Sequence, residues 1–327
     1  MRSRPRTARS YLPLFRDLLD DQGAQAFPQG LGPMDELLAL SLARSEGLRP
    51  HEKCRIAAAM GSAESFAAMD IAEAQALLGR VLRPELWNPR GMVELAKRDR
   101  EYFRGKGILF IALDNPAYPP QLREAYRPPF GLYLRGRLPD PSAPAVAIVG
   151  TRIATGQGLS AAYKLAKDLA GQDIWVVSGL AVGIDAAAHR GALSEGGRTL
   201  AILPGGMESI YPPSNRGLAA AILEKGGGLA TEYPPFSRIF KYRFPERNRI
   251  IAGLSRSCVL VQAPEKSGAL ITAEHALAEG RDVFVHRACI GGARNSGADL
   301  LAQQGAAVVG SAADIFAEWS AHAAEER

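Results

Sequence analysis

From residue 145 onward, the chain alternates short apolar runs with longer segments of helical periodicity. The apolar runs occupy residues 146–149, 174–177, 200–203, 229–231, 258–262, 283–285 and 306–309. Continuous apolar runs are typical of strands buried on both faces, and helices between such runs are typical of parallel strands joined by crossovers. The pattern therefore predicts an α/β fold, an extended Rossmann-like, doubly wound and mostly parallel sheet.

The segment before residue 106 has a different pattern of apolar residues. Apolar residues recur at helical spacing from 34 to 105, with short polar breaks such as residues 61–63, which predicts a small all-helical domain. Two further apolar runs, residues 108–112 and 131–134, read as strands, and the proline-rich stretch between them reads as an ordered loop. We therefore expect a helical domain over 34–105 and a larger α/β domain over 106–327.

The composition restricts the cellular setting. The 327 residues are 47% hydrophobic, and the formal net charge is +5. Residues 1–33 carry several arginines but no apolar core of a signal peptide, so we expect a mobile tail. The cysteines Cys54, Cys258 and Cys289 are too few and too dispersed for a disulfide framework or a zinc site, which favours a reducing cytoplasm. No apolar run of about 18 residues occurs, so no membrane-spanning helix is expected.

A dense run of cations lies between Arg238 and Arg249. Five basic residues occur there against a single acid, Glu246. The run stands directly before an apolar helical pattern, where free backbone N–H groups and the helix dipole also favour an anion. The charge of this run indicates an anion site, and its length makes a polyanion a candidate ligand.

Turns rich in small residues follow four of the predicted strands. They cover residues 150–158, 178–185, 204–206 and 265–272. Because ligands of open parallel sheets bind outside the carboxyl ends of the strands, we expect these turns to converge on one anion-binding surface. The turns contain neither the G-x-G-x-x-G dinucleotide pattern nor a P-loop.

Phe244 is open to two interpretations. As a residue of the core it needs no functional explanation. Flanked by Lys241, Arg243 and Arg247, it is alternatively a platform on which an unpaired nucleobase stacks while the cations hold phosphates. The sequence alone leaves both interpretations open.

Catalytic motifs are weak by comparison. Asp185 and His189 are four residues apart and could meet on one helix face, but no nucleophile is tied to them, so we expect a packing or capping role. His275 and His286 are isolated, and no metal-ligand spacing is present. We therefore expect no catalytic residue, no metal and no cofactor, and predict that the chain is not an enzyme.

Several of these segments together resemble one known family, DNA-processing protein A (DprA/Smf). The resemblance rests on residues 149–152, 178–189, 204–206 with 211–213, the F-P-E-R-N-R sequence at 244–249, and residues 266–273; residues 118–122 also match. It spans residues 114–319 in unbroken order. The helical segment is similar to the sterile-alpha-motif-like (SAM-like) domain that often precedes this domain. Many members continue into a winged-helix domain, whereas this sequence has one further helical segment before Arg327.

Membership would imply a protein that binds single-stranded DNA cooperatively, protects it and hands it to the RecA recombinase in natural transformation or recombination. Homodimers are also implied. Phosphate contacts would come from Arg152, Lys241, Arg247, Asn248, Arg249, Lys266 and Ser267. Backbone donors would come from Gly150, Thr151, Ser178, Gly179, Gly205 and Gly206. Phe244 would stack a base, and Arg243 and Gly268 complete the expected site.

Two other functions compete with this interpretation. Residues 204–206 resemble part of the P-G-G-x-G-T-x-x-E signature of nucleoside monophosphate phosphoribohydrolases, but the G-T pair is missing and the glutamate is displaced. A nucleotide-sensing or structural module without DNA affinity is the third reading. Such a module would bind a mononucleotide and would be indifferent to the length of a DNA strand.

Overall fold

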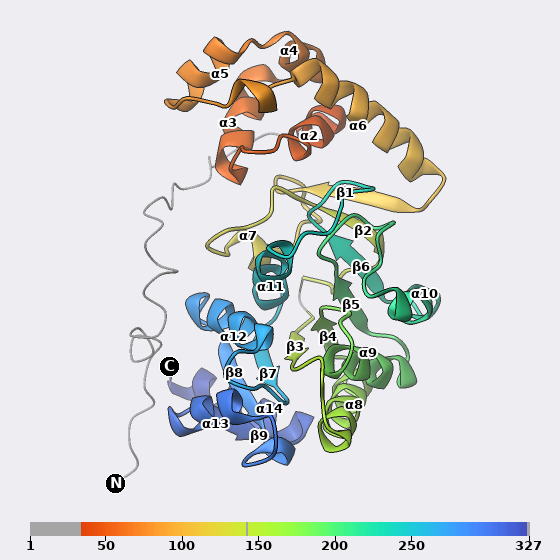
Figure 1. The fold of residues 1–327 in the computed structure, drawn as a ribbon, viewed down its shortest axis with the longest axis vertical. Coiled ribbons are helices and arrows are strands. Elements are labelled where there is room, and N and C mark those ends of the chain that lie inside the picture. The colour runs from red at the N-terminus through yellow and green to blue at the C-terminus, as the bar shows by residue number, and fades with distance from the viewer. Residues whose placement is uncertain (1–33, 142, 326–327) are drawn as a thin grey trace.

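The computed structural model describes residues 34–141 and 143–325, in which nine strands form one sheet (Figure 1). The order of the strands is β1-β2-β6-β5-β4-β3-β7-β8-β9. Their bounds are β1 Ile108–Ala112, β2 Gly131–Gly136, β3 Ala145–Val149, β4 Trp175–Ser178, β5 Thr199–Ile202, β6 Gly228–Thr231, β7 Ser257–Leu260, β8 Asp282–His286 and β9 Ala307–Val309. Strands β3 to β9 are mutually parallel, and β1 and β2 extend the edge at β6 in antiparallel pairing. The mostly parallel sheet is confirmed.

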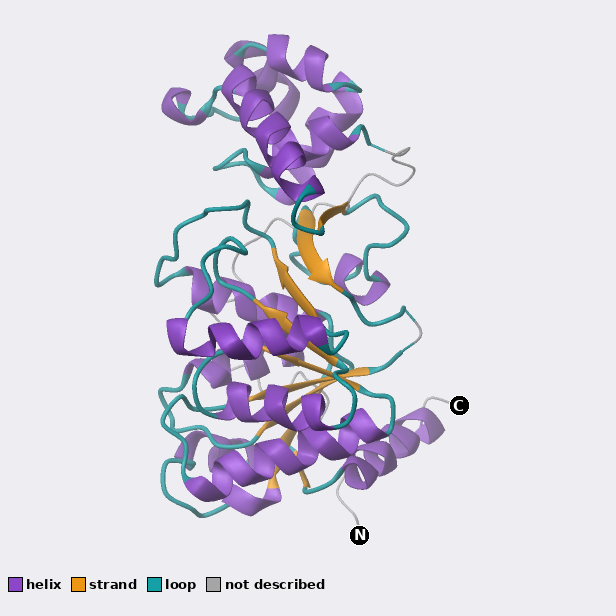
Figure 2. Cartoon of the chain, turned by 90° about the vertical axis from the view of Figure 1, so that its right-hand side faces the viewer, coloured by secondary structure: helices purple, strands orange, loops and turns teal. Residues whose placement is uncertain are grey.

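Helices cover both faces of the sheet (Figure 2). On β3, Val146 and Ile148 belong to one apolar cluster, whereas Ala145, Ala147 and Val149 belong to another. The first cluster includes residues of α8 (Gly156–Gly171), α9 (Ile184–Ser194) and α14 (Ala312–Glu325), and the second includes residues of α11 (Arg243–Gly253), α12 (Gly268–Ala278) and α13 (Ser296–Gln303). Helix α10 (Arg216–Glu224) packs beside α9. This two-sided cover confirms the doubly wound architecture.

A bundle of short helices lies above β1 and β2 (Figure 1). It comprises α2 (Glu36–Ala43), α3 (Pro50–Met60), α4 (Ala63–Ala68), α5 (Ile71–Leu78) and α6 (Pro89–Arg104). Polar side chains cap several of these helices at their first residues, where backbone N–H groups lack helical partners: the Asp35 carboxylate accepts from the Leu38 N–H, and Ser62 caps α4 in the same way. The predicted helical texture of this segment is confirmed.

The bundle and the sheet share one apolar core. Phe103 of α6 packs edge-on against Tyr133 of β2 with the ring centroids 5.7 Å apart. Tyr102 meets Phe236, which lies after β6, at 5.1 Å. The buried apolar cluster continues from the bundle into the sheet. The domain division at residue 105 therefore stays a prediction from the sequence.

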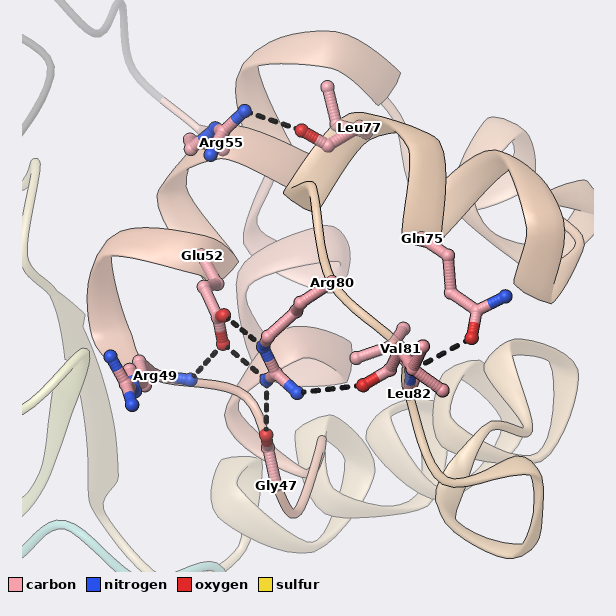
Figure 3. A network of polar contacts seen from close by, with 9 residues as sticks. All are labelled: Gly47, Arg49, Glu52, Arg55, Gln75, Leu77, Arg80, Val81 and Leu82. Carbon is pink, nitrogen blue, oxygen red and sulfur yellow. Dashed lines mark hydrogen bonds and ion pairs between the residues drawn. The ribbon is translucent and has the colours of Figure 1, made fainter.

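One arginine ties the turns of the bundle together (Figure 3). The guanidinium of Arg80 binds both carboxylate oxygens of Glu52, at 2.5 and 2.8 Å, and donates to the carbonyl oxygen of Gly47 at 2.8 Å. The same Glu52 carboxylate accepts from the backbone N–H of Arg49 at 2.7 Å. The charge of Arg80 is thereby used within the bundle.

Three details differ from expectation or lie outside it. The proline-rich stretch contains a short helix, α7 (Pro120–Arg123), because Pro120 takes the first helical position, where no N–H is needed. Single turns of 3₁₀-helix lie at Pro84–Leu86, Pro213–Asn215 and Arg287–Cys289. The expected tail, residues 1–33, lies outside the described residues.

The described helices include none that is both long and apolar enough to cross a bilayer.

Candidate nucleic-acid interface

A cavity of about 600 Å³ opens at the carboxyl ends of β3 and β7. The strand order reverses there, because β4, β5 and β6 follow β3 on one side and β8 and β9 follow β7 on the other. Such a switch point is where open α/β sheets bind ligands. Ten of the sixteen expected site residues line this cavity, namely Gly150, Thr151, Arg152, Lys241, Phe244, Arg247, Asn248, Lys266, Ser267 and Gly268.

Gln262, which the sequence analysis did not place in the site, holds the loops around the cavity. Its backbone oxygen accepts from the N–H of Thr151 at 2.7 Å, and its side-chain oxygen accepts from the N–H of Thr155 at 2.9 Å. Its amide nitrogen donates to the carbonyl oxygen of Ala293 at 2.7 Å. The sequence signal that could have identified it is a polar residue at the end of an apolar run.

Gly183 explains how the turn after β4 reaches the turn after β3. Its φ is +82°, which side chains rarely tolerate, and a Cβ atom there would lie 2.4 Å from the carbonyl oxygen of Thr151. The Ile184 N–H donates to that same oxygen at 3.3 Å. Close backbone approach at Gly183 therefore brings α9 to the wall of the cavity.

Three cations at the cavity have no polar partner. Arg152, Lys241 and Lys266 are exposed, and among the described residues none of their side chains makes a hydrogen bond or an ion pair. The guanidinium of Arg152 lies over the ring of Phe244, 5.0 Å from its centroid. Their charge is therefore available to a ligand.

Phe244 is half-buried and forms part of an aromatic wall. Its ring meets that of Tyr211 edge-on, with the centroids 5.5 Å apart and the planes at 71°. Tyr211, which was not among the expected site residues, is 43% exposed and also lines the cavity. Phe244 is thus partly packed, as a core residue would be, and partly open to the cavity, as a stacking platform would be.

The first turn of α12 adds backbone donors to the same cavity. Ser267 caps this helix, since its hydroxyl accepts from the Ala269 N–H at 3.3 Å. The side-chain amide of Asn248 donates to the carbonyl oxygen of Gly268 at 3.1 Å and so ties α11 to this turn. The helix N-terminus contributes partial positive charge beside Lys266.

The sequence pattern predicts that the whole cationic run precedes a helix. In the structure only Arg238 and Lys241 do so, and the other three cations lie within the first turns of α11. The helix begins at Arg243, because Pro245 is compatible with a first turn, where N–H groups have no intrahelical partners. Consequently Arg247 and Arg249, two residues apart on one helix, point in different directions.

Arg247 is buried beneath the cavity. Its guanidinium donates to the carbonyl oxygen of Ile202, and a Cβ atom on Gly179 would lie 2.3 Å from it. Burial lowers the pKa of Arg247 to about 10, against the nearby carboxylate of Asp185, which favours the charged form. The arginine is still a cation at neutral pH, and it lies in the floor of the cavity.

Arg249 and Arg243 do not line the cavity. Arg249 forms an ion pair with Glu232 and donates to the carbonyl oxygen of Arg127 at 2.7 Å. Arg243 donates to the carbonyl oxygen of Arg238 at 2.7 Å and is 7% exposed. Arg249 is therefore paired and Arg243 is buried, so neither charge is free to bind a ligand.

The other four expected residues also lie outside the cavity lining. The hydroxyl of Ser178 donates to the carbonyl oxygen of Ile148 at 2.7 Å, and the N–H of Gly179 donates to Asp185 at 3.1 Å. The N–H of Gly206 donates to the carbonyl oxygen of Ser237 at 3.2 Å, and a Cβ atom on Gly205 would lie 2.7 Å from Ile239. These glycines accommodate neighbouring chain segments.

The residues with catalytic potential have structural partners. The Asp185 carboxylate accepts from the N–H groups of Gly179 and Ala181 at 3.1 and 3.4 Å, which holds the turn between β4 and α9, and burial raises its pKa. His189 is buried, with Nδ1 2.7 Å from the hydroxyl of Thr199. Asp185 is the one carboxylate among the described residues that line the cavity. The described side chains contain no cluster suited to a metal ion. The described lining therefore offers no second carboxylate beside Asp185 for the phosphoribohydrolase alternative.

Known proteins resemble the chain over most of the α/β region. Residues 109–320 match the family model of DNA recombination-mediator protein A. DNA processing protein DprA of Streptococcus pneumoniae is 40% identical over 64% of this chain and 73% of its own length. Protein Smf of Borreliella burgdorferi is 39% identical over 60% of this chain, and the match spans 61% of that protein.

Two solved structures share the fold. The X-ray structure of DprA from Streptococcus pneumoniae covers 88% of this chain and 99% of its own, with a TM-score of 0.70 and 31% identity. DNA processing protein A from Helicobacter pylori, whose structure concerns its mode of binding single-stranded DNA, covers 61% of this chain and 89% of its own, with a TM-score of 0.53 and 28% identity. By its sequence match and its fold, this chain belongs to the DNA recombination-mediator protein A family, DprA/Smf.

Proposed function

We propose that this chain binds single-stranded DNA in the cavity at the switch point of the sheet. The observation that carries the proposal is the pairing of unpartnered cations with an aromatic wall. Arg152, Lys241 and Lys266 line the same cavity as Phe244 and Tyr211. Cations next to an accessible ring are what a strand with free bases requires, since phosphates contact the charges while a base stacks.

The shape of the site favours single strands over duplexes. Only an unpaired base exposes a face to a ring, and Phe244 is recessed in a cavity rather than displayed on a flat surface. The relative from Helicobacter pylori, described by its single-stranded DNA binding mode, supports the same ligand class. In this proposal the phosphates meet the three exposed cations and the first turn of α12.

The remaining expected residues act indirectly in this proposal. Arg247 supplies positive charge from the floor of the cavity, and Asn248 holds the turn at Gly268. Gly179 leaves room for the guanidinium of Arg247. Gly205 and Gly206 leave room for the segment that carries Lys241. Removal of these residues would disturb the positions of the exposed cations rather than remove a phosphate contact.

The cellular role we propose is the family's role in DNA processing. In it, the chain protects incoming single strands in the cytoplasm and delivers them to the RecA recombinase during natural transformation or recombination. It acts as a homodimer and binds rather than converts its ligand. Support comes from relatives named as DNA processing proteins, which are 40% identical in Streptococcus pneumoniae and Bacillus subtilis.

Fluorescence anisotropy tests the DNA site. A labelled oligothymidine is titrated with the protein at several salt concentrations, with unlabelled duplex as competitor. We expect salt-sensitive binding that excess duplex does not displace, because phosphate contacts release counterions and stacking requires free bases. Absence of binding at low salt, or binding of a mononucleotide with indifference to strand length, would contradict the proposal.

A further inference from the structure

A second aromatic cluster lies just outside the cavity, in the segment before α11. Phe240 and Tyr242 are 47% and 57% exposed. Their rings are stacked, with the centroids 5.7 Å apart and the planes at 12°. Neither residue lines the cavity, so the site described above does not use them.

Arg243 holds the stacked pair in place. Its guanidinium lies 5.1 Å from the ring centroid of Phe240, 5.9 Å from that of Tyr242 and 4.1 Å from that of Tyr233. It is fixed in turn by its hydrogen bond to the carbonyl oxygen of Arg238. The rings are therefore ordered before any ligand arrives, which reduces the entropy lost on binding.

Lys241 connects this pair to the cavity. It is the residue between Phe240 and Tyr242, its side chain lines the cavity, and it has no polar partner among the described residues. Adjacent Cα atoms are about 3.8 Å apart, so a phosphate held by Lys241 brings its neighbouring base within reach of the ring pair. Arg243 is 7% exposed, so it orders the rings and is not itself a phosphate contact.

We propose that Phe240 and Tyr242 form a second stacking platform, which receives a base of the same DNA strand beyond the one at Phe244. This inference rests on the proposed function and extends the path of the strand out of the cavity. Arg243 is a positioning residue for this platform. Phe236 offers a contrast: it is 63% exposed, but its ring packs on Tyr102 within the chain.

Two oligonucleotides of equal length separate stacking from charge: oligothymidine, and a strand of abasic sugars with the same phosphates. Affinities are measured for the native protein, for the double variant Phe240→Ala/Tyr242→Ala, and for Phe244→Ala. Phe236→Ala is the matched control, since it removes an exposed ring from the same segment. Phe240→Tyr retains an aromatic face and should behave as the native protein does.

We expect the double variant to lose affinity for oligothymidine by about 5- to 150-fold, the effect of one stacked base. Its affinity for the abasic strand and its salt dependence should stay unchanged, because stacking involves no counterion release. Phe236→Ala should bind both strands normally. The thermal midpoint of each variant checks that the fold is intact.

Several results would overturn the inference. An unchanged affinity of the double variant for oligothymidine would do so, as would an equal loss on both strands. Sedimentation without DNA supplies a third: a change from dimer to monomer, with DNA affinity retained, would assign the ring pair to contact between two copies of the chain. If the native protein fails to bind oligothymidine, the proposed function fails too. If it binds and only Phe244→Ala weakens it, the second platform alone is refuted.

Discussion

The helical bundle and the cavity differ in whether their cations have carboxylate partners. In the bundle, Arg44 pairs with Asp99 through two contacts of 2.6 Å, and Arg80 pairs with Glu52. At the cavity, Arg152 and Lys241 have no carboxylate partner among the described residues. The fold depends on a buried pair because removal of one partner leaves a buried charge, whereas unpaired cations that face one cavity repel one another and favour a polyanion. A carboxylate partner therefore distinguishes cations that maintain the structure from cations available to a ligand.

The largest expected effect comes from breaking a pair in the bundle. Arg44→Ala leaves the Asp99 carboxylate, whose side chain is only 6% exposed, without its partner. We expect a loss of about 3–5 kcal/mol in the free energy of unfolding, measured by urea denaturation. The folded variant should bind oligothymidine as the native protein does.

Lys97→Ala provides the matched control for that measurement. Its partner Glu94 is 63% exposed, so this pair should contribute at most about 0.5 kcal/mol. A destabilisation of similar size in the two variants would contradict the distinction between buried and exposed pairs.

His189 and Arg247 form a buried layer beneath the cavity. Protonation of His189 should make the stability of the fold depend on pH. Burial lowers the pKa of His189 from 6.5 to about 3, with Arg247 as a further cause. As pH falls, the unfolded chain takes up the proton first, so stability is lost between pH 6.5 and about 3. From about pH 7 to about pH 5 this one group should cost about 2 kcal/mol.

His189→Gln tests that assignment. The stability difference between the native protein and this variant should shift by about 2 kcal/mol in favour of the variant over the same pH interval. A slope from His275 should remain, since burial also lowers its pKa, to about 4. Parallel pH profiles of the two proteins would show that His189 is not held neutral in the folded chain.

The sequence predicted the sheet better than the direction of its charged side chains. Parallel strands are buried on both faces and so appear as apolar runs; for example, the predicted strand at 283–285 lies within β8. Directions depend on where a helix begins. Arg247 and Arg249 are two residues apart, hence about 200° apart around α11, and cannot face one ligand. The sequence pattern predicts a later start of the helix, and the two arginines then appear as one charge cluster.

The sequence also does not show whether a given glycine faces a ligand or a neighbouring segment of the chain. A glycine before a helix suits either a phosphate or a neighbouring segment, and the same residue type serves both. A Cβ atom would collide with a neighbouring segment at both Gly150 and Gly206, at 2.5 Å from Ile184 and 2.6 Å from the carbonyl oxygen of Pro234, but only Gly150 lines the cavity. Only the path of the loop after β6, which crosses the end of β5, distinguishes the two cases. Long-range contacts of this kind leave no local pattern.

At the cavity, the aromatic wall should matter for affinity without involving charge. Phe244→Ala removes the stacking face and its contacts with Arg152 and Tyr211. We expect a loss of about 1–3 kcal/mol in binding free energy for oligothymidine, with the salt slope retained. Anisotropy titrations across a salt series measure both quantities. A collapse of the thermal midpoint, rather than of affinity, would favour the core interpretation of Phe244.

The smallest effect is the most direct test of the comparison. Lys241→Ala removes an unpaired cation, so the slope of log affinity against log salt should fall by about 0.7, the value for one phosphate contact of a single strand. Arg249→Ala is the matched control on the same segment, because its guanidinium is already neutralised by Glu232. Its salt slope should equal that of the native protein. If Arg249→Ala lowered the slope and Lys241→Ala did not, the division between structural and ligand-binding cations would be reversed at this site.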